Sequence, residues 1–267
     1  MLKPTFRDAL SAAGSPLVGL WTASGSAVAA EIMAGSGADL LLVDGEHSPV
    51  TLPEMLTLLQ AVEPYPVTTL VRVPWLDEVF IKQVLDLGAQ NILIPKVSTA
   101  EDAALAVRAA RYPGREGERD GIRGIGSALA RSSRWGRVGG YVGDADRTVS
   151  VTVQIETARG VENARAIAEV DGVDAVFIGP ADLAGSMGFA GVPSTAAVVE
   201  AVDETIAAVR DAGCRVGVNA FAEADADRVL DRGADFVFIG ADVTLMARGS
   251  ERAVQRLRPS TGTTDSY

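Results

Sequence analysis

Two carboxylates occupy equivalent places in the sequence, each just past a short apolar run. Glu156 closes the run "SVTVQIE" and Asp182 follows the run "AVFIG". If these runs are neighbouring parallel strands of one barrel, both acids can face one point above the strand ends. Two carboxylates with water or substrate oxygens suit a hard, octahedral divalent ion such as Mg²⁺ or Mn²⁺, and zinc is less suitable because no second histidine is present. The alternative is that Asp182, in "GPADL", caps a helix.

The only histidine of the chain lies close to another acid. His47 follows the run "LLLVD", which ends in Asp44, and Glu46 lies between them. At a strand end, an aspartate can orient the imidazole and raise its pKa toward neutrality, which makes a general acid–base pair. The alternative is that His47 is a satisfied polar residue and Asp44 a turn residue.

Two cations lie at similar places. Arg72 interrupts the apolar run "TLVRV", and a buried arginine must either pair with an acid of the core or receive a substrate oxyanion. Lys96, one of three lysines, follows "NILIP". It would form a Schiff base with a carbonyl substrate or, more simply, extend from the rim into water.

Eight short, almost continuously apolar runs position these residues, as expected of parallel strands buried on both faces. The predicted strands are 17–21, 40–44, 69–73, 91–95, 150–156, 175–179, 215–219 and 236–240. Amphipathic segments between them predict helices, for example 100–111, 160–169, 195–212 and 223–232. Eight strands that alternate with helices favour a (β/α)8 barrel. A doubly wound sheet is disfavoured because the first turn, "TASGSA", lacks its glycine fingerprint.

Composition narrows the class further. The net charge of −11 disfavours binding to nucleic acid or an anionic membrane, and the single cysteine, Cys214, fits a reducing compartment. The first residues lack the apolar core of a signal peptide, and no run reaches the length of a membrane span. We therefore expect a cytoplasmic protein with one domain over residues 1–258 and a flexible tail over 259–267.

Residues 112–149 do not fit the regular alternation. This segment is rich in glycine and arginine, and a connection of such length in a compact domain is functional or partly disordered. Its clustered arginines either form a solvated face or anchor an acidic substrate or subunit: Arg123, Arg131, Arg134 and Arg137.

From about residue 5 to residue 258 the sequence resembles the HpcH/HpaI aldolases, the metal-dependent pyruvate aldolases. The resemblance rests on "LLVDGEHSP", "IKQVLDLGAQNILIPKV", "GIRGIGSALARSSRWGR" and "VQIETARGVENARAIAEVDGVDAVFIGPADLAGSMGF". It implies a phosphoenolpyruvate/pyruvate-type (β/α)8 barrel whose C-terminal helix is swapped between subunits of a hexamer, a dimer of trimers. It also implies an aldehyde-lyase that reversibly cleaves 4-hydroxy-2-oxo acids to pyruvate and an aldehyde, with Mg²⁺, Mn²⁺ or Co²⁺ as cofactor.

The same resemblance implies the site that binds metal and pyruvate. Glu156 and Asp182 hold the ion, which stabilises the enolate of pyruvate. Gln154 lies near the metal, and the backbone amides of Ala181 and Asp182 hold the pyruvate carboxylate.

The remaining roles implied by the resemblance are catalytic. His47 and Asp44 form the acid–base pair, and His47 exchanges the proton of the C4 hydroxyl. Arg72 provides positive charge beside the reacting oxygen. Asp86, in "VLDLGA", reaches the site of a neighbouring subunit.

Two stretches depart from the family pattern, and both border the aldehyde end of the site: "PGREGERDG" (113–121) and "VNAFAEAD" (218–225). Three alternatives remain: a Schiff-base aldolase that uses Lys96, a CoA-ester lyase of the citrate-lyase type, and a non-enzymatic barrel. The sequence does not define the aldehyde, the cellular metal or the stereochemistry.

Overall fold

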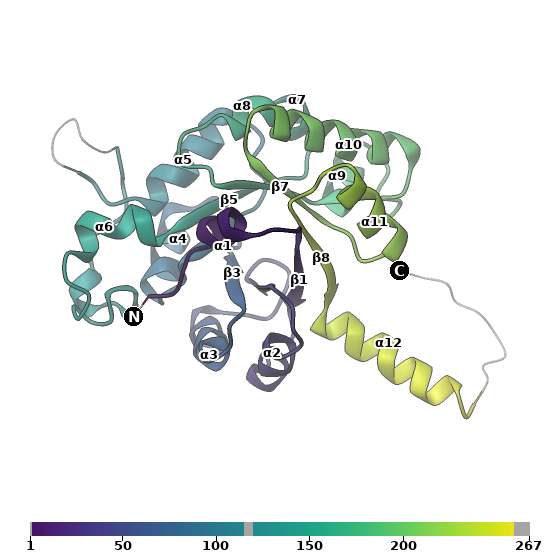
Figure 1. Ribbon diagram of the computed structural model, residues 1–267, viewed down its shortest axis with the longest axis horizontal. Helices are drawn as coiled ribbons and strands as arrows, with labels where there is room; N and C mark the ends of the chain where they lie inside the picture. The colour runs from purple at the N-terminus through teal and green to yellow at the C-terminus, as the bar shows by residue number, and fades with distance from the viewer. Residues whose placement is uncertain (1, 115–119, 259–267) are drawn as a thin grey trace.

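The fold is a ring of eight parallel strands, closed between the first and the last (Figure 1). A computed structural model describes residues 2–114 and 120–258, so the predicted tail and part of the 113–121 stretch lie outside the described residues. The strands are β1 (Leu17–Thr22), β2 (Leu40–Asp44), β3 (Thr68–Arg72), β4 (Asn91–Ile94), β5 (Ser150–Ile155), β6 (Ala175–Ile178), β7 (Arg215–Asn219) and β8 (Phe236–Ala241). Each end lies within one residue of its predicted position.

Helices cover the outside of the ring. They are α1 (Phe6–Ala12), α2 (Ala27–Ala34), α3 (Leu52–Val62), α4 (Glu78–Asp86), α5 (Ala100–Ala110), α6 (Tyr141–Thr148), α7 (Ala158–Glu162), α8 (Ala164–Ala168), α9 (Pro180–Ser186), α10 (Ala196–Asp211), α11 (Glu223–Asp231) and α12 (Asp242–Gln255), with the 3₁₀ helices η1 (Ser127–Leu129) and η2 (Arg131–Ser133). One predicted helix, 160–169, is divided into α7 and α8. The division falls at Asn163, whose side-chain amide donates to the carbonyls of Ser98 and Arg159.

The pairing of β1 with β8 decides between the two predicted architectures. Leu17 is in register with Phe236, and every other strand pairs in parallel with its neighbours in sequence. An open doubly wound sheet would leave these two strands as edges, so the prediction of a (β/α)8 barrel is confirmed.

Large apolar side chains fill the inside of the ring. The buried cluster consists of Phe6, Leu10, Trp21, Leu40, Leu42, Leu70, Leu93, Ala175, Phe177, Phe236, Phe238 and Ala241. Two glycines make room for its aromatic rings. A Cβ atom on Gly19 would lie 2.5 Å from the ring of Phe238, and one on Gly217 would lie 2.2 Å from the ring of Phe236. The barrel is therefore a packed core, open to chemistry only at its ends.

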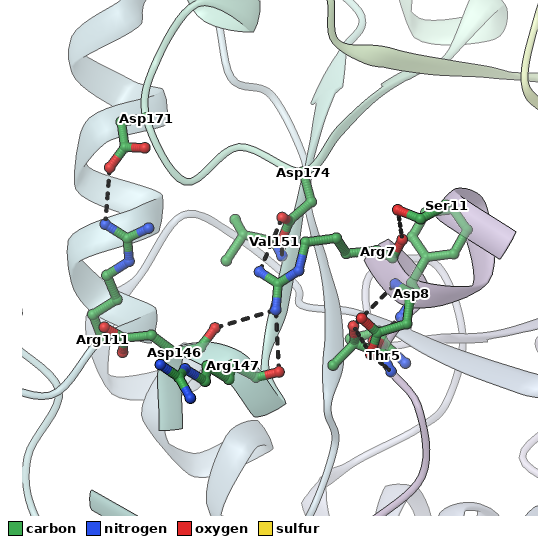
Figure 2. Close-up of polar contacts among 12 residues, drawn as sticks. Thr5, Arg7, Asp8, Ser11, Arg111, Asp146, Arg147, Val151, Asp171 and Asp174 are labelled. Carbon is green, nitrogen blue, oxygen red and sulfur yellow. Dashed lines mark hydrogen bonds and ion pairs between the residues drawn. The ribbon is translucent and has the colours of Figure 1, made fainter. Parts of the chain in front are cut away.

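Helix α1 closes the amino end of the barrel. The buried Phe6 ring meets Phe236 edge to face, with centroids 5.0 Å apart. Figure 2 shows how Arg7 fixes the helix: its guanidinium lies 3.2 Å from Asp174, whose other oxygen accepts the backbone N–H of Val151 at 2.8 Å. With one end closed, substrate chemistry belongs at the opposite end, where the strands finish.

Helix α12 stands away from the body of the molecule (Figure 1). Its main contacts are with β1, β8 and α2. Four apolar side chains of α12, and that of Leu257 just after the helix, are 40–78% exposed. The four in the helix are Val243, Leu245, Met246 and Val254. No helix of the described residues is long and apolar enough to cross a membrane.

Candidate active site

The carboxyl ends of β2 and β3 place one arginine between two acids. Arg72, the last residue of β3, lies beside Asp44, the last residue of β2. Its Nε and Nη2 are 2.9 and 2.8 Å from the two oxygens of Asp44, a bidentate pair, and Nη1 is 2.9 Å from Oε2 of Glu46. All three side chains are at least nine-tenths buried. Burial raises the pKa of Glu46, against the opposing positive charge of Arg72.

Asp44 supports this cluster from the backbone as well. Its Oδ1 accepts the amide N–H of Glu46 at 3.0 Å and that of His47 at 3.4 Å, which is the turn expected of an aspartate before a glycine. The acid–base pair was predicted with Asp44 orienting the imidazole. The predicted contact between Asp44 and the imidazole is wrong, because the carboxylate of Asp44 accepts from the backbone of His47 and does not contact its ring.

The imidazole of His47 has a different neighbour. Its Nε2 lies 3.8 Å from Oε1 of Glu46, and its side chain is 62% exposed at the barrel mouth. A ring placed there is free to approach a substrate. Glu46 therefore links the arginine and the histidine, a role that the sequence did not reveal although Glu46 lies between the two predicted residues.

Glu156 is a buried carboxylate at the end of β5. Its Oε1 accepts the backbone N–H of Lys96 at 2.8 Å, and its Oε2 accepts the side-chain amide of Gln154. Burial, followed by the negative charges of Glu46 and Asp182, raises the pKa of Glu156 to about 7. The surroundings of Glu156 therefore lack the positive charge that would stabilise its ionised carboxylate.

Asp182 lies in the first turn of α9 and is exposed, near enough for its charge to raise the pKa of Glu156. The residue that caps α9 is Gly179, with no side-chain hydrogen bond, so the alternative in which Asp182 is the cap is wrong. Leu183 is bonded to the carbonyl of Gly179, which leaves the earlier amides of Ala181 and Asp182 available at the helix start.

These residues fit a divalent cation. A Cβ atom at Gly179 would lie 2.6 Å from Nε2 of Gln154 and 3.0 Å from Oε2 of Glu156, so only glycine leaves the pair undisturbed. Oε1 of Gln154 is buried without a hydrogen-bond partner. Across residues 2–114 and 120–258, no three histidine, cysteine or acidic side chains form a metal site by themselves. An ion held by Glu156 and Asp182 would complete its shell with water or substrate oxygens, as predicted for a hard cation.

Trp21 of β1 forms the floor under Arg72. Cζ of Arg72 lies 4.6 Å from the ring centroid, and Nε1 of Trp21 donates to Oδ1 of Asn219, at the end of β7, at 2.9 Å. Trp21 was not among the predicted site residues, because a tryptophan in an apolar strand resembles any other core residue. Its polar N–H was the one available signal, since a buried indole needs an acceptor.

Asp86 is paired within its own chain. Its Oδ1 is 2.7 Å from Nη2 of Arg123, a fully buried arginine stacked on the ring of Tyr112 at 4.3 Å. Arg131 and Arg134 both pair with Glu63. The fourth clustered arginine, Arg137, lies over the ring of Trp135 at 5.9 Å. All four therefore contact acids or rings of the same chain, so a freely solvated face does not describe them, and their anchoring of an acidic substrate or subunit stays a prediction.

Lys96 is exposed at the rim, with its ammonium 5.3 Å from the ring centroid of Trp75. Schiff-base lysines are typically activated by a desolvated or cationic setting, which this residue lacks. Asp242, after β8, is committed to structure, because it accepts the backbone N–H groups of Ala23 and Ser24.

Comparison with known proteins places this geometry in context. Residues 17–249 match the family described as HpcH/HpaI aldolase/citrate lyase. The chain is 50% identical over 262 residues to the 4-hydroxy-2-oxo-heptane-1,7-dioate aldolase of Klebsiella pneumoniae subsp. pneumoniae, which covers 98% of this chain and 97% of that protein. Its fold is similar to that of an HpcH/HpaI aldolase/citrate lyase family protein from Burkholderia cenocepacia, with a TM-score of 0.90, 37% identity and coverage of 94% and 98%. It is also similar to that of an HpcH/HpaI aldolase from Desulfitobacterium hafniense, with a TM-score of 0.86 and 28% identity, over 98% of this chain and 100% of that chain.

Proposed function

The chain belongs to the HpcH/HpaI aldolase/citrate lyase family, and we propose that it is a divalent-metal-dependent aldolase that reversibly cleaves 4-hydroxy-2-oxo acids to pyruvate and an aldehyde. The observation that supports this most is the crowding of Glu156. Burial and the charges of Glu46 and Asp182 raise its pKa to about 7, and a divalent cation between the acids would offset that repulsion.

In this proposal Glu156 and Asp182 hold the ion. A bound Mg²⁺, Mn²⁺ or Co²⁺ supplies Lewis-acid stabilisation of the pyruvate enolate, worth several kcal/mol. Gln154 orients Glu156 through its amide, as outer partners of metal ligands do. The free amides of Ala181 and Asp182 bind the carboxylate of pyruvate at the start of α9.

Arg72 provides fixed positive charge for the oxyanion that develops when the C3–C4 bond breaks. Asp44 and Glu46 hold its guanidinium on three nitrogens, and the ring of Trp21 supports its face. Because the group is held before the reaction, no reorganisation is needed as charge develops.

His47 moves the proton. Its Nε2 takes the proton of the C4 hydroxyl as the C3–C4 bond breaks, and protonation of the enolate at C3 then gives pyruvate. In condensation the imidazolium returns the proton to the C4 oxygen, a contribution of about 10²–10⁴-fold. Asp44 acts as a positioning residue, because it holds the guanidinium of Arg72 and the backbone that precedes the imidazole.

The experiment measures pyruvate release from 4-hydroxy-2-oxoheptane-1,7-dioate after a chelator and after addition of Mg²⁺, Mn²⁺ or Co²⁺. Loss and recovery of activity are expected. Activity that survives chelation, together with inactivation by borohydride in the presence of pyruvate, would instead favour a Schiff base on Lys96. Lys96→Met is the matched control, because inactivation by borohydride through a Schiff base on Lys96 would be lost in this variant.

We also propose that α12 is exchanged between subunits of a hexamer, a dimer of trimers. Its apolar side chains are exposed, and α2 offers a matching exposed face in Val28 and Ile32, which are 66% and 68% exposed. In such an assembly Asp86 would reach a neighbouring site. Light scattering during size-exclusion chromatography should give six times the mass of the chain, and a monomer would contradict the exchange.

A further inference from the structure

Lys96 occupies an unusual position at the mouth of the barrel. Its φ is +55°, in the left-handed region that non-glycine residues rarely adopt, and its amide N–H donates to Oε1 of Glu156 at 2.8 Å. This conformation has an energetic cost, and such costs cluster at functional sites. The hydrogen bond fixes the start of the lysine side chain directly beside the carboxylate to which we assign the metal.

The side chain itself ends in an uncommitted charge. Its ammonium lies over the ring of Trp75, 5.3 Å from the centroid, and Trp75 is itself 52% exposed. Among the described residues, the ammonium of Lys96 has no ion pair with a carboxylate, and its contact is the ring of Trp75, although the net charge of the protein is −11. Arg72, by contrast, is already paired with Asp44 and Glu46. An aromatic platform of this kind holds an extended lysine in place while its N–H groups remain available.

The substrate expected from the proposed function has a matching geometry. With pyruvate at Glu156 and Asp182, the aldehyde half of a 4-hydroxy-2-oxo acid extends away from the metal toward the rim. The Klebsiella relative is named as an aldolase of 4-hydroxy-2-oxo-heptane-1,7-dioate, and in that compound the aldehyde half ends in a carboxylate. Cleavage between C3 and C4 leaves it as the four-carbon aldehyde 4-oxobutanoate.

We propose that Lys96 is a specificity-determining residue that binds a carboxylate at the aldehyde end of the substrate, above the ring of Trp75. The proposal rests on the aldolase function. In it, Lys96 makes the enzyme prefer aldehydes with an acidic tail over neutral aldehydes of equal length. A charge-assisted hydrogen bond of this kind typically changes affinity by about tenfold or more.

The test compares condensation of pyruvate with 4-oxobutanoate and with butanal, which has the same length and no charge. For Lys96→Met, KM for 4-oxobutanoate should rise about tenfold or more with kcat nearly unchanged, and butanal kinetics should not move. Lys96→Arg should recover most of the preference. Lys82→Met, which removes the same charge from α4, serves as the matched control and should behave as the wild type.

Exchange of the pyruvate methyl protons with deuterated water separates the two proposals, because it reports enolate formation without an aldehyde. If the wild type with Mg²⁺ or Mn²⁺ neither exchanges these protons nor joins pyruvate to an aldehyde, the aldolase function itself is wrong. If exchange is intact but both aldehydes lose activity equally in Lys96→Met, or neither does, the role of Lys96 is overturned.

Discussion

Replacement of Glu156 by glutamine is expected to stabilise the metal-free protein above pH 7. Burial, then the charges of Glu46 and Asp182, raise the pKa of this carboxyl group from its ordinary 4.5 to about 7. The folded state therefore keeps a proton that the unfolded chain has released. Stability that is complete below about pH 4.5 is lost as the pH rises through about 7. At about 1.4 kcal/mol per pKa unit, the loss is about 3 kcal/mol.

The neutral side chain fits the same space. A glutamine at position 156 can still accept the backbone N–H of Lys96 through its carbonyl oxygen. Its amide would face the amide of Gln154, but Oε1 of Gln154 is buried without a partner and becomes an acceptor when that group rotates. The rotated Nε2 of Gln154 then takes the place where Oε1 had no partner, so one buried donor is unpaired at every pH. This lost hydrogen bond reduces the electrostatic gain by about 1–3 kcal/mol.

Urea unfolding of the metal-free proteins at pH 5 and pH 8 measures the effect. Because the lost hydrogen bond costs the same at both pH values, the stability of Glu156→Gln relative to the wild type should increase by about 2–3 kcal/mol between pH 5 and pH 8. Mn²⁺ at a hundred times its dissociation constant should stabilise the wild type by about 2.7 kcal/mol and leave the variant unmoved. Glu162→Gln, on the exposed side of α7, is the control and should show neither effect. A difference that is the same at both pH values would refute the reasoning.

Three further variants test separate parts of the site. Gly179→Ala places a methyl 2.6 Å from the amide of Gln154, so calorimetric titration should show Mn²⁺ affinity reduced about 10–100-fold; unchanged affinity would contradict the packing argument. Arg72→Lys retains the charge but not the bidentate pair with Asp44, and kcat should fall about 10²–10³-fold, whereas a loss below threefold would rule out a preorganised guanidinium. Asp242→Ala leaves amides of the β1–α2 loop unpaired and should lower the free energy of unfolding by about 1–3 kcal/mol in urea; an unaffected protein would show that water replaces the carboxylate.

Matched controls keep these results specific. Gly185→Ala lies in the same helix as Asp182, and its added methyl meets no atom within 4 Å, so metal affinity should be preserved. For the arginine, circular dichroism of the variant should match the wild type, because the substitution leaves the strand pairing of β3 unaltered.

The strands, and the position of most candidate-site residues at strand ends, could be predicted because both follow local rules. Parallel strands buried on two faces are written as continuous apolar runs, and their ends define the mouth of a barrel. Glu156, Asp182, Arg72 and His47 are all polar residues at such ends, so their convergence follows once the ring closes.

What the sequence did not reveal is which partner each side chain selects. Glu46 and Asp44 are both close in sequence to His47. Only tertiary geometry shows that both acids pair with the guanidinium of Arg72 and that Glu46 also faces the imidazole. Likewise, the pair of Arg123 with Asp86 joins residues 37 positions apart, through an irregular segment that has no periodic pattern.

Anomalous diffraction from crystals soaked with Mn²⁺ and pyruvate would test directly whether Glu156 and Asp182 share one divalent ion with pyruvate. We expect an anomalous peak within about 2.0–2.4 Å of an oxygen from each carboxylate, with the carboxylate and 2-oxo oxygens of pyruvate completing the shell. A peak bound elsewhere, or pyruvate bound at the barrel mouth with no manganese between these two acids, would contradict it.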